Sequence, residues 1–566
     1  MKEIIIVGNG LAGLSAAIEA SESGAKVVLI AQAPPERSQS VMAAGGINAA
    51  LNTKGQDDSP LQHCEDTLRA GCDLADQEAV RAMTMAAPEL IKKLSRLGAV
   101  FSRDERGNVN LRYFGGQKKM RTAYAKSAIG KQLMCGLAQQ LRKLEARGNI
   151  EVKENCRFLS AIIQQGKCFG GVFENTRTGQ LFSLTGDALI LATGGMNGVF
   201  GNTTGSILSD GSAIAAVFRQ GVKLGNAEMI QYHPTTVDTK GKRMLISEAA
   251  RGEGGRLFTY KNGKPWYFME DWYPEGGNLM PRDVVSRGIY RVCHELDLGI
   301  DHRESVYLDI SFLSKKEIEL KLREINDLCQ TYLKLDPSEE PIPVYPGIHY
   351  FMGGIYVDKN HESSIEGLYA AGECACQYHG ANRLGGNSTL GAIYGGKTAA
   401  RTAALSSGLE RDSITVNAEW IKVRNQYAEK EIQRIQCRLD HFNAGRTTPC
   451  QIISEMRKTM NRSMGIERNE KELKEGIQSI NCLIDQAKDL SLGQLQPSEA
   501  IVAEDLLLLG KALLYSALER RESRGAHFRR DYPERNDERY LRTTVATCFG
   551  KNDIQISFKE IGEGAM

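Results

Sequence analysis

The feature that most constrains this chain is a glycine-rich turn placed directly after a short apolar strand. Residues 3–7 predict a buried strand, and Gly8, Gly10 and Gly13 follow in the spacing G-x-G-x-x-G before a run of small and apolar residues at 14–18. Glycines in this spacing permit a tight turn and let a pyrophosphate approach the positive N-terminal end of the next helix. The pattern predicts a dinucleotide-binding α/β fold, and the alternative is a turn that serves packing alone.

The end of the second predicted strand, 26–30, departs from the usual dinucleotide pattern. An acidic residue is expected there to bind a ribose, but the strand runs into Ala31 and Gln32. We therefore expect a ribose contact that is not the usual carboxylate.

Later strand ends favour FAD over NAD. A second glycine cluster lies near residue 45, Thr193 and Gly194 end another predicted strand, and Glu373 follows a strand at 367–370. An FAD domain made of two sequence parts closes with such a late strand, whose end meets the ribityl chain. Each of these features taken singly is also compatible with an ordinary strand-to-helix turn.

Charge and cysteine content exclude several classes of protein. Lysine and arginine (71) nearly cancel aspartate and glutamate (69), so nothing favours nucleic acid or an anionic membrane as the main partner. The 13 cysteines are scattered without C-x2-C pairs, which argues against a disulfide scaffold, zinc or a self-held iron–sulfur cluster. We expect no metal site.

Targeting signals also are not evident. A strand begins at once, without a charged and then apolar leader, and the best apolar run, 506–518, is interrupted by Gly510 and Lys511. We expect a soluble, cytoplasmic chain.

Changes in composition predict five segments. Alternating strands and helices come first, aromatic and proline-punctuated sequence follows, and only 10 of the 58 glycines lie after residue 400, where charged helical patterns cover 417–439, 471–490 and 497–521. The predicted fold is α/β: a two-part Rossmann-like FAD-binding domain, an inserted α+β capping domain and a C-terminal helical domain. The predicted segments are FAD-binding domain, first part (1–230); capping domain (231–345); FAD-binding domain, second part (346–410); helical domain (411–530); and C-terminal arm (531–566).

Seven segments carry a specific resemblance, which runs in order along nearly the whole chain. They are 37–48 (RSQSVMAAGGIN), 112–116 (RYFGG), 231–235 (QYHPT), 247–255 (SEAARGEGG), 281–285 (PRDVV), 349–354 (HYFMGG) and 379–388 (HGANRLGGNS). Together they resemble the flavoprotein subunits of succinate dehydrogenase and fumarate reductase, the complex II family. The resemblance continues to the segment 521–527, and the charged run at 520–524 is expected to have a structural role or to contact a partner.

The resemblance implies a site for fumarate or succinate. A dicarboxylate needs two separate cationic or donor clamps, and a guanidinium fork suits a carboxylate. Chemistry alone would nominate a histidine as proton donor to the substrate carbon; only the resemblance assigns this role to Arg282, supplied by Glu248 and Arg251. The residues that the resemblance makes catalytic are Arg282, Glu248, Arg251 and His233, and those that it makes substrate-binding are Phe114, Ser247, His349, Arg383 and Gly46.

The glycine turn, the strand ends and the resemblance together give a set of residues expected to hold FAD. These are Gly8, Gly10, Ala12, Gly13, Ala31, Gln32, Ser38, Gln39, Ser40, Ala44, Gly45, Gly46, Thr193, Gly194, Asp210, His349, Tyr350, Glu373, Arg383, Ser388 and Thr389.

One residue departs from the family pattern. Members with covalent FAD carry a histidine at the position of Gln39, and an amide cannot form that bond. The departure predicts non-covalent FAD and, since covalent attachment accompanies efficient succinate oxidation in the family, chemistry that favours fumarate reduction.

Two other functions stay open. L-aspartate oxidase shares the scaffold and non-covalent FAD, but it carries a glutamate for the substrate ammonium in the segment that here reads Phe114-Gly115-Gly116. A catalytically silent FAD-binding assembly subunit is the alternative from another class. The family also implies an iron–sulfur subunit and a quinone-reactive membrane anchor as partners, and thus indirect attachment to the cytoplasmic face of a membrane. No nucleic acid is expected.

Overall fold

A computed structural model describes residues 1–126, 128–239, 242–406, 414–442, 445, 447–491, 496, 498–550 and 553–565, with side chains of the helix at 414–440 described from residue 421. The predicted boundary between residues 410 and 411, and the predicted helix start at Pro497, lie outside these residues.

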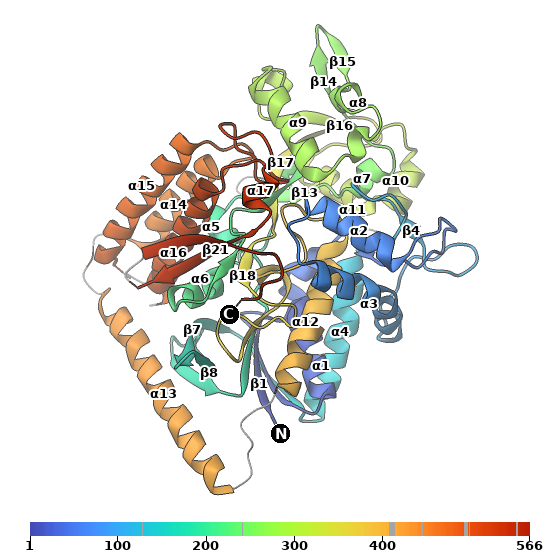
Figure 1. Ribbon diagram of the computed structural model, residues 1–566. Helices are drawn as coiled ribbons and strands as arrows, with labels where there is room; N and C mark the ends of the chain where they lie inside the picture. Colours follow the sequence, from blue (N-terminus) through green and yellow to red (C-terminus); the bar gives the residue numbers. More distant parts are fainter. Residues whose placement is uncertain are drawn as a thin grey trace.

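A five-stranded parallel sheet forms the base of the molecule (Figure 1). Its strands, in spatial order, are β19 (Leu368–Ala370), β10 (Ala188–Leu191), β1 (Glu3–Val7), β2 (Lys26–Ile30) and β6 (Ile150–Lys153). β1 shows why the strands are apolar throughout: Ile4 and Ile6 pack into one buried cluster, and Ile5 and Val7 pack into another on the opposite face.

Helices cover one face of the parallel sheet, and a smaller antiparallel sheet covers the other face. The helices are α1 (Leu11–Glu22), α3 (Gln77–Arg96), α4 (Ile129–Ala146) and α12 (Asn387–Leu405), which lie together in Figure 1. An antiparallel sheet of β7 (Cys156–Gln164), β8 (Lys167–Asn175) and β9 (Leu181–Thr185) contacts β10. A further sheet consists of the short strands β3 (Ile47–Asn48), β5 (Thr122–Ala123) and β4 (Leu111–Arg112). In the sequence, α2 (Pro60–Ala70) lies between β3 and β4.

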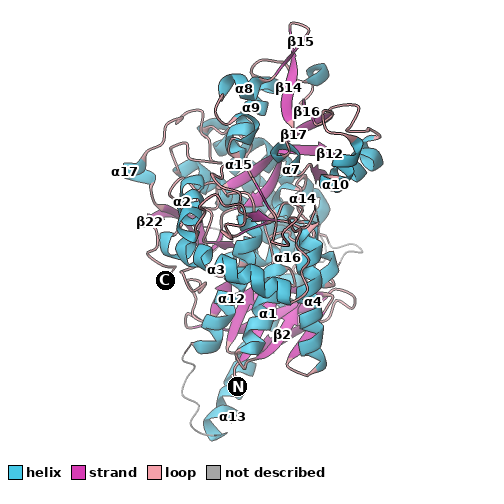
Figure 2. Ribbon diagram, turned by 90° about the vertical axis from the view of Figure 1, so that its right-hand side faces the viewer, coloured by secondary structure: helices cyan, strands magenta, loops and turns pink. Residues whose placement is uncertain are grey.

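A six-stranded antiparallel sheet lies above the parallel sheet in both views (Figures 1 and 2). Its order is β13 (Arg243–Leu245), β12 (Ile230–Asp238), β17 (Ile342–Phe351), β16 (Val306–Asp309), β14 (Arg256–Lys261) and β15 (Lys264–Trp266). The helices of this region are α7 (Ala249–Gly252), α8 (Phe268–Trp272), α9 (Arg282–His294), α10 (Lys315–Lys321) and α11 (Arg323–Leu328). We call this region, residues 230–351, the cap.

The described residues of the C-terminal region form four long helices, one more than the sequence patterns predict. They are α13 (Ile414–Asp440), α14 (Pro449–Ser463), α15 (Glu470–Gln486) and α16 (Ser498–Glu519). The additional helix, α14, begins with a capping box in which Thr448 and Gln451 satisfy each other's backbone N–H groups, a signal that is readable in the sequence.

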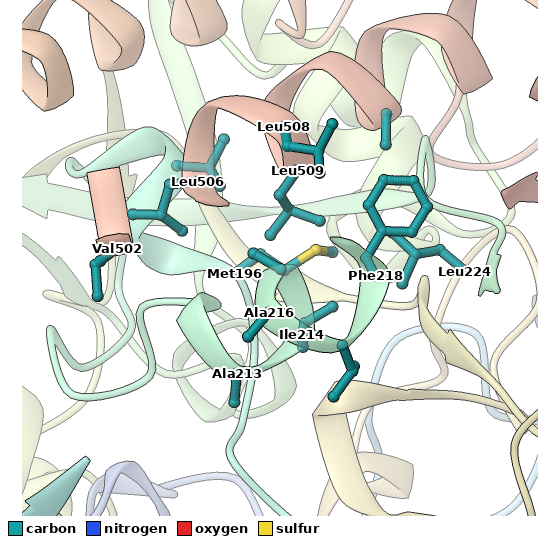
Figure 3. Packing of buried hydrophobic residues seen from close by; sticks show 14 of the residues in the cluster. Met196, Ala213, Ile214, Ala216, Phe218, Leu224, Val502, Leu506, Leu508 and Leu509 are labelled. Atoms are coloured by element: carbon teal, nitrogen blue, oxygen red, sulfur yellow. The ribbon is translucent and has the colours of Figure 1, made fainter. Parts of the chain in front are cut away.

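α16 is apolar on nearly all sides because it is enclosed. Its leucines pack against α6 (Ser212–Arg219), with Leu509 lying beside Met196 and Ile214 (Figure 3). Its neighbours on other sides include α14 and α15, while α13 packs on the β7–β9 sheet. Across the described residues, no helix combines the length and the apolar character that a bilayer span requires.

The predicted C-terminal arm contains a hairpin that completes a sheet. Strands β21 (Thr543–Phe549) and β22 (Asp553–Lys559), which follow α17 (Asp537–Tyr540), join β11 (Leu224–Gly225), β18 (Gly354–Tyr356) and β20 (Ala375–Cys376) in the order β20-β18-β11-β21-β22.

Three of the four charged side chains in the run at 520–524 are interior, whereas Arg521 is exposed. Arg520, Glu522 and Arg524 are each 0–2% exposed, and Glu522 accepts hydrogen bonds from both arginines. Arg520 also donates to Glu228, so this run joins the end of α16 to the segment that enters the cap sheet. Burial of these three side chains gives them a structural role and excludes direct contact with a nucleic acid.

Candidate active site

A cavity of about 610 Å³ lies between the carboxyl ends of the parallel strands and the cap. Its volume is in the range of small-molecule sites, and its place at these strand ends is where α/β sheets bind ligands. The segments after β1, β2, β10 and β19 line one end of the cavity, and cap residues line the other.

The turn after β1 is shaped for close approach by a ligand. Gly8 has φ +105°, and a Cβ there would lie 2.3 Å from the carbonyl oxygen of Ala192, so only glycine fits. Gly8, Gly10 and Ala12 line the cavity, whereas Gly13 does not. A Cβ at Gly13 would lie 1.8 Å from the carbonyl oxygen of Gly8, so this glycine lets the helix pack closely on the turn.

The other residues predicted to hold FAD converge on this cavity. Its lining includes Ala31, Gln32, Ser38, Gln39, Ser40, Ala44, Gly45, Gly46, Thr193, Gly194, Asp210, His349, Tyr350, Glu373, Arg383, Ser388 and Thr389. Ser40 fixes the turn by accepting a hydrogen bond from the N–H of Leu11 at 3.0 Å.

Two polar side chains here suit an enclosed polar ligand. The hydroxyl of Thr193 is buried without a partner among the described residues, and burial raises the pKa of Glu373 to about 7 although its carboxylate accepts the N–H of Phe351. A ligand with hydroxyl groups would satisfy both. With the glycine turn, these features fit FAD.

The opposite end of the cavity gathers the predicted substrate residues. They are Gly46 and Phe114 from the sheet region, His233, Ser247, Glu248, Arg282 and His349 from the cap, and Arg383 from the loop before α12. The rings of His233 and His349, on neighbouring strands β12 and β17, lie 5.2 Å apart between centroids.

A β-bulge aims His349 at the cavity. In the pairing of β12 with β17, Gln231 faces Tyr350 and the next residue, Tyr232, faces Ile348, so His349 is the extra residue. Bulges turn a side chain out of the regular alternation and are common beside active sites.

Glu248 and Arg282 form a buried ion pair at the cavity wall. Arg282 begins α9 and donates from Nε at 2.9 Å and from Nη2 at 2.6 Å to Oε2 of Glu248. The N–H of Gly115 donates to Oε1 at 2.9 Å, and a Cβ at Gly115 would lie 2.6 Å from this oxygen, which explains the glycine. Burial alone would raise the pKa of Glu248, but Arg282 and Arg251 lower it to about 2. The carboxylate is therefore ionised at neutral pH.

Arg251 lies behind this pair and does not line the cavity. Its Nη2 is 3.5 Å from Oε1 of Glu248, and its Nη1 donates to the carbonyl oxygen of Asn278 at 2.6 Å. Arg251 can therefore reach a ligand only through Glu248.

The site is electropositive. Arg383 stacks on Tyr350 with its guanidinium carbon 4.4 Å from the ring centre, and burial together with the charge of Arg282 lowers the pKa of Arg383 to about 9. Burial and the nearby arginines hold the pKa of His233 and of His349 well below the ordinary range, so both rings are neutral. Arg282 and Arg383 line the cavity and Arg251 lies behind Glu248, so three arginine charges face one carboxylate, and this surplus of positive charge suits a dianion.

Two residues of this site were missing from the sequence prediction. Gln231 accepts a hydrogen bond from Nη1 of Arg282 at 3.0 Å and donates to the carbonyl oxygen of Arg383 at 2.8 Å. It stands two residues before His233 on one strand, a spacing that the sequence displays. Thr204, in a loop, lies 2.8 Å from Nδ1 of His349, and nothing in the sequence indicates this contact.

The sequence matches known protein families and individual proteins along most of its length. An FAD binding domain family matches residues 3–389, and a fumarate reductase flavoprotein C-terminal family matches residues 453–564. The succinate dehydrogenase flavoprotein subunit of Bacillus subtilis is 40% identical over 552 residues, covering 96% of this chain and 93% of that protein. The fumarate reductase flavoprotein subunit of Mycobacterium tuberculosis is 33% identical over 577 residues, covering 98% and 96%.

Solved structures agree with these relatives. A variant of the E. coli quinol fumarate reductase FrdA superposes with a TM-score of 0.88 at 30% identity, covering 100% of this chain and 97% of that one. Mycobacterium smegmatis Sdh1 superposes with a TM-score of 0.82 at 29% identity, covering 99% and 94%. The chain carries an FAD-binding domain and belongs to the family of succinate dehydrogenase and fumarate reductase flavoprotein subunits.

Proposed function

We propose that this chain interconverts fumarate and succinate as the flavoprotein subunit of a complex, and that fumarate reduction is the favoured direction. FAD, when bound in the cavity, supplies the two-electron redox chemistry. The remaining tasks fall to the protein: holding two carboxylates, orienting the double bond and moving one proton.

The observation that carries the proposal is the pair of buried arginines at one end of the cavity. Arg282 comes from the cap and Arg383 from the loop before α12, so a dianion between them meets cations from two sides. His233, Ser247 and His349 add neutral hydrogen-bonding groups.

Proton delivery follows from the contacts of Arg282. Its guanidinium faces the cavity and is bonded to an ionised carboxylate, Glu248, which in turn lies 3.5 Å from Arg251. We assign to Arg282 the transfer of a proton to the substrate carbon, with Glu248 and Arg251 as the path that restores it. The three side chains of this path are 0–7% exposed, so bulk water does not compete with them for the proton.

Turnover of purified holoprotein tests the proposal. Fumarate reduction with a reduced viologen dye, and succinate oxidation with an electron-accepting dye, measure the two directions. Arg282→Lys keeps the charge but loses the fork, and we expect a fall of about 100-fold or more in kcat. Arg291→Lys, an exposed substitution on the same helix, is the matched control and should leave turnover unchanged.

The alternatives have distinct outcomes in these assays. Turnover of L-aspartate would favour L-aspartate oxidase; Phe114, which lines the substrate end of the cavity, provides no carboxylate for an ammonium group. Protein that binds FAD but turns over no dicarboxylate in either direction would favour the silent assembly subunit.

The preference for fumarate reduction rests on Gln39. Its amide donates to the carbonyl oxygen of Thr204 at 3.3 Å and cannot form the covalent bond to flavin that a histidine forms. A higher rate of succinate oxidation than of fumarate reduction, with dyes of matched driving force, would contradict the preference.

We further propose an iron–sulfur subunit and a quinone-reactive membrane anchor as partners, with attachment to the cytoplasmic face of the membrane through them. Structural relatives were determined with menaquinol and with UQ1, which supports a quinone-linked complex. Purification of tagged chain from its own cells, followed by iron and quinone analysis, tests this assembly. Recovery of the chain alone in the supernatant, without iron, would contradict it.

A further inference from the structure

Thr204 touches the histidine that the bulge aims into the cavity. Its Oγ1 lies 2.8 Å from Nδ1 of His349, and its backbone N–H donates to the carbonyl oxygen of Ile348 at 3.0 Å. The side-chain amide of Gln39 donates a hydrogen bond to the backbone carbonyl oxygen of Thr204. The threonine is buried and its position is thus fixed by three separate contacts.

The contact decides which nitrogen of His349 carries the proton. His349 is neutral, so only one ring nitrogen is protonated. The Thr204 hydroxyl has no other hydrogen-bond partner among the described residues, and it therefore satisfies its proton by donating to Nδ1. An accepting Nδ1 requires the proton on Nε2, which has no partner in the described part of the chain.

We propose that Thr204 is a positioning residue for substrate binding: by donating to Nδ1 it holds His349 as the tautomer whose Nε2–H points a donor at a substrate carboxylate. This role rests on the proposed function. The bulge sets the direction in which the His349 ring points, and the hydrogen bond from Thr204 fixes the rotation of the ring and its tautomer. A carboxylate can only accept hydrogen bonds, so the opposite tautomer would place a lone pair against it.

Substitution of the hydroxyl gives the first test, in the holoprotein. Thr204→Val keeps the shape of the side chain, and we expect the KM for fumarate and the Kd for malonate, a non-reacting dicarboxylate, to rise about tenfold with a smaller change in kcat. Thr204→Ser, which retains the hydroxyl, should restore both values. Ser206→Ala removes a hydroxyl from the same loop, which among the described residues accepts a hydrogen bond only from the N–H of Leu208, and it should change neither value.

A spectroscopic test separates this role from the proposed function. In protein labelled with nitrogen-15 in histidine, ring nitrogen shifts distinguish protonated from unprotonated nitrogens, and His349→Gln identifies the signal. We expect an unprotonated Nδ1 in the unsubstituted protein and loss of that single state in Thr204→Val. A protonated Nδ1, or Thr204→Val with unchanged spectra and KM, overturns the proposal. If the protein reduces no fumarate, the proposed function fails, while the nitrogen spectrum still decides whether Thr204 sets the tautomer.

Discussion

Replacing Glu248 by glutamine would leave the arginines of the site without their shared counter-ion while hardly changing its shape. Glu248 accepts two hydrogen bonds from Arg282 and one from Gly115, and lies 3.5 Å from Arg251. The pKa of Glu248 is about 2 against an ordinary value of 4.5, which corresponds to about 3 kcal/mol of net stabilisation of its charge. Removing one partner of a buried ion pair typically costs about 3–5 kcal/mol.

A bound dianion should recover part of this loss. We expect Glu248→Gln to lower the thermal midpoint of the ligand-free holoprotein by several degrees, and malonate to raise it more than in the unsubstituted protein, because the ligand supplies the missing negative charge. The kcat for fumarate reduction should fall by about 10²–10⁴, since the proton path is cut, without a rise in KM.

The assay is thermal unfolding with and without malonate, combined with steady-state fumarate reduction at equal flavin content. Glu248→Asp is the control, because it retains the charge and should show the smaller stability loss. Equal thermal midpoints and equal kcat for Glu248→Gln and the unsubstituted protein would refute the reasoning, since the buried charge would then have no measurable consequence.

Three further predictions concern other parts of the chain. Acid precipitation should release all FAD into the supernatant because Gln39 cannot bond it covalently; flavin that stays with the pellet would contradict this. In the flavin-free protein, burial raises the pKa of Glu373 from 4.5 to about 7, so the folded state binds more protons than the unfolded state between these values. Its contribution to the free energy of unfolding is therefore largest below pH 4.5 and falls, by at most about 3 kcal/mol, as the pH rises through 7; Glu373→Gln should remove this fall in denaturant titrations across pH. Glu522→Gln leaves Arg520 and Arg524 buried without their carboxylate and should lower the thermal midpoint strongly, whereas kcat per bound flavin should be unchanged; a normal midpoint would show that this network is not needed for stability.

The parts of the fold that depend on local sequence could be predicted from the sequence alone. The strand, turn and helix at residues 3–22 depend on neighbouring residues, and so do the apolar periodicity of α15 and the nearly continuous apolar sequence of α16. α14 was missed because it is polar overall, although its apolar residues recur at helical spacing and its capping box marks the start. The hairpin β21–β22 is local in sequence, but its docking on β11, a two-residue strand far away in the chain, could not be predicted from either segment.

The residues of the candidate site also divide into those that could be predicted from local sequence and those that could not. Motif residues such as Arg282 and Arg383 could be named in advance, but Gly13 and Arg251 stand outside the cavity lining because each serves a neighbour that does line it. The bulge at His349 depends on the register between two strands, and no pattern within either strand encodes it. Contacts between residues far apart in the chain, such as that of Thr204 with His349, therefore cannot be predicted from single sequence segments.

The pairing of β11 with β21 has a consequence for how the protein is made. Leu224 and Gly225 leave the ribosome some three hundred residues before their partners Ala546 and Val545 are synthesised. Until then this edge of β11 has no partner strand. A chain truncated before β21 should therefore expose this strand edge to chaperones and proteases.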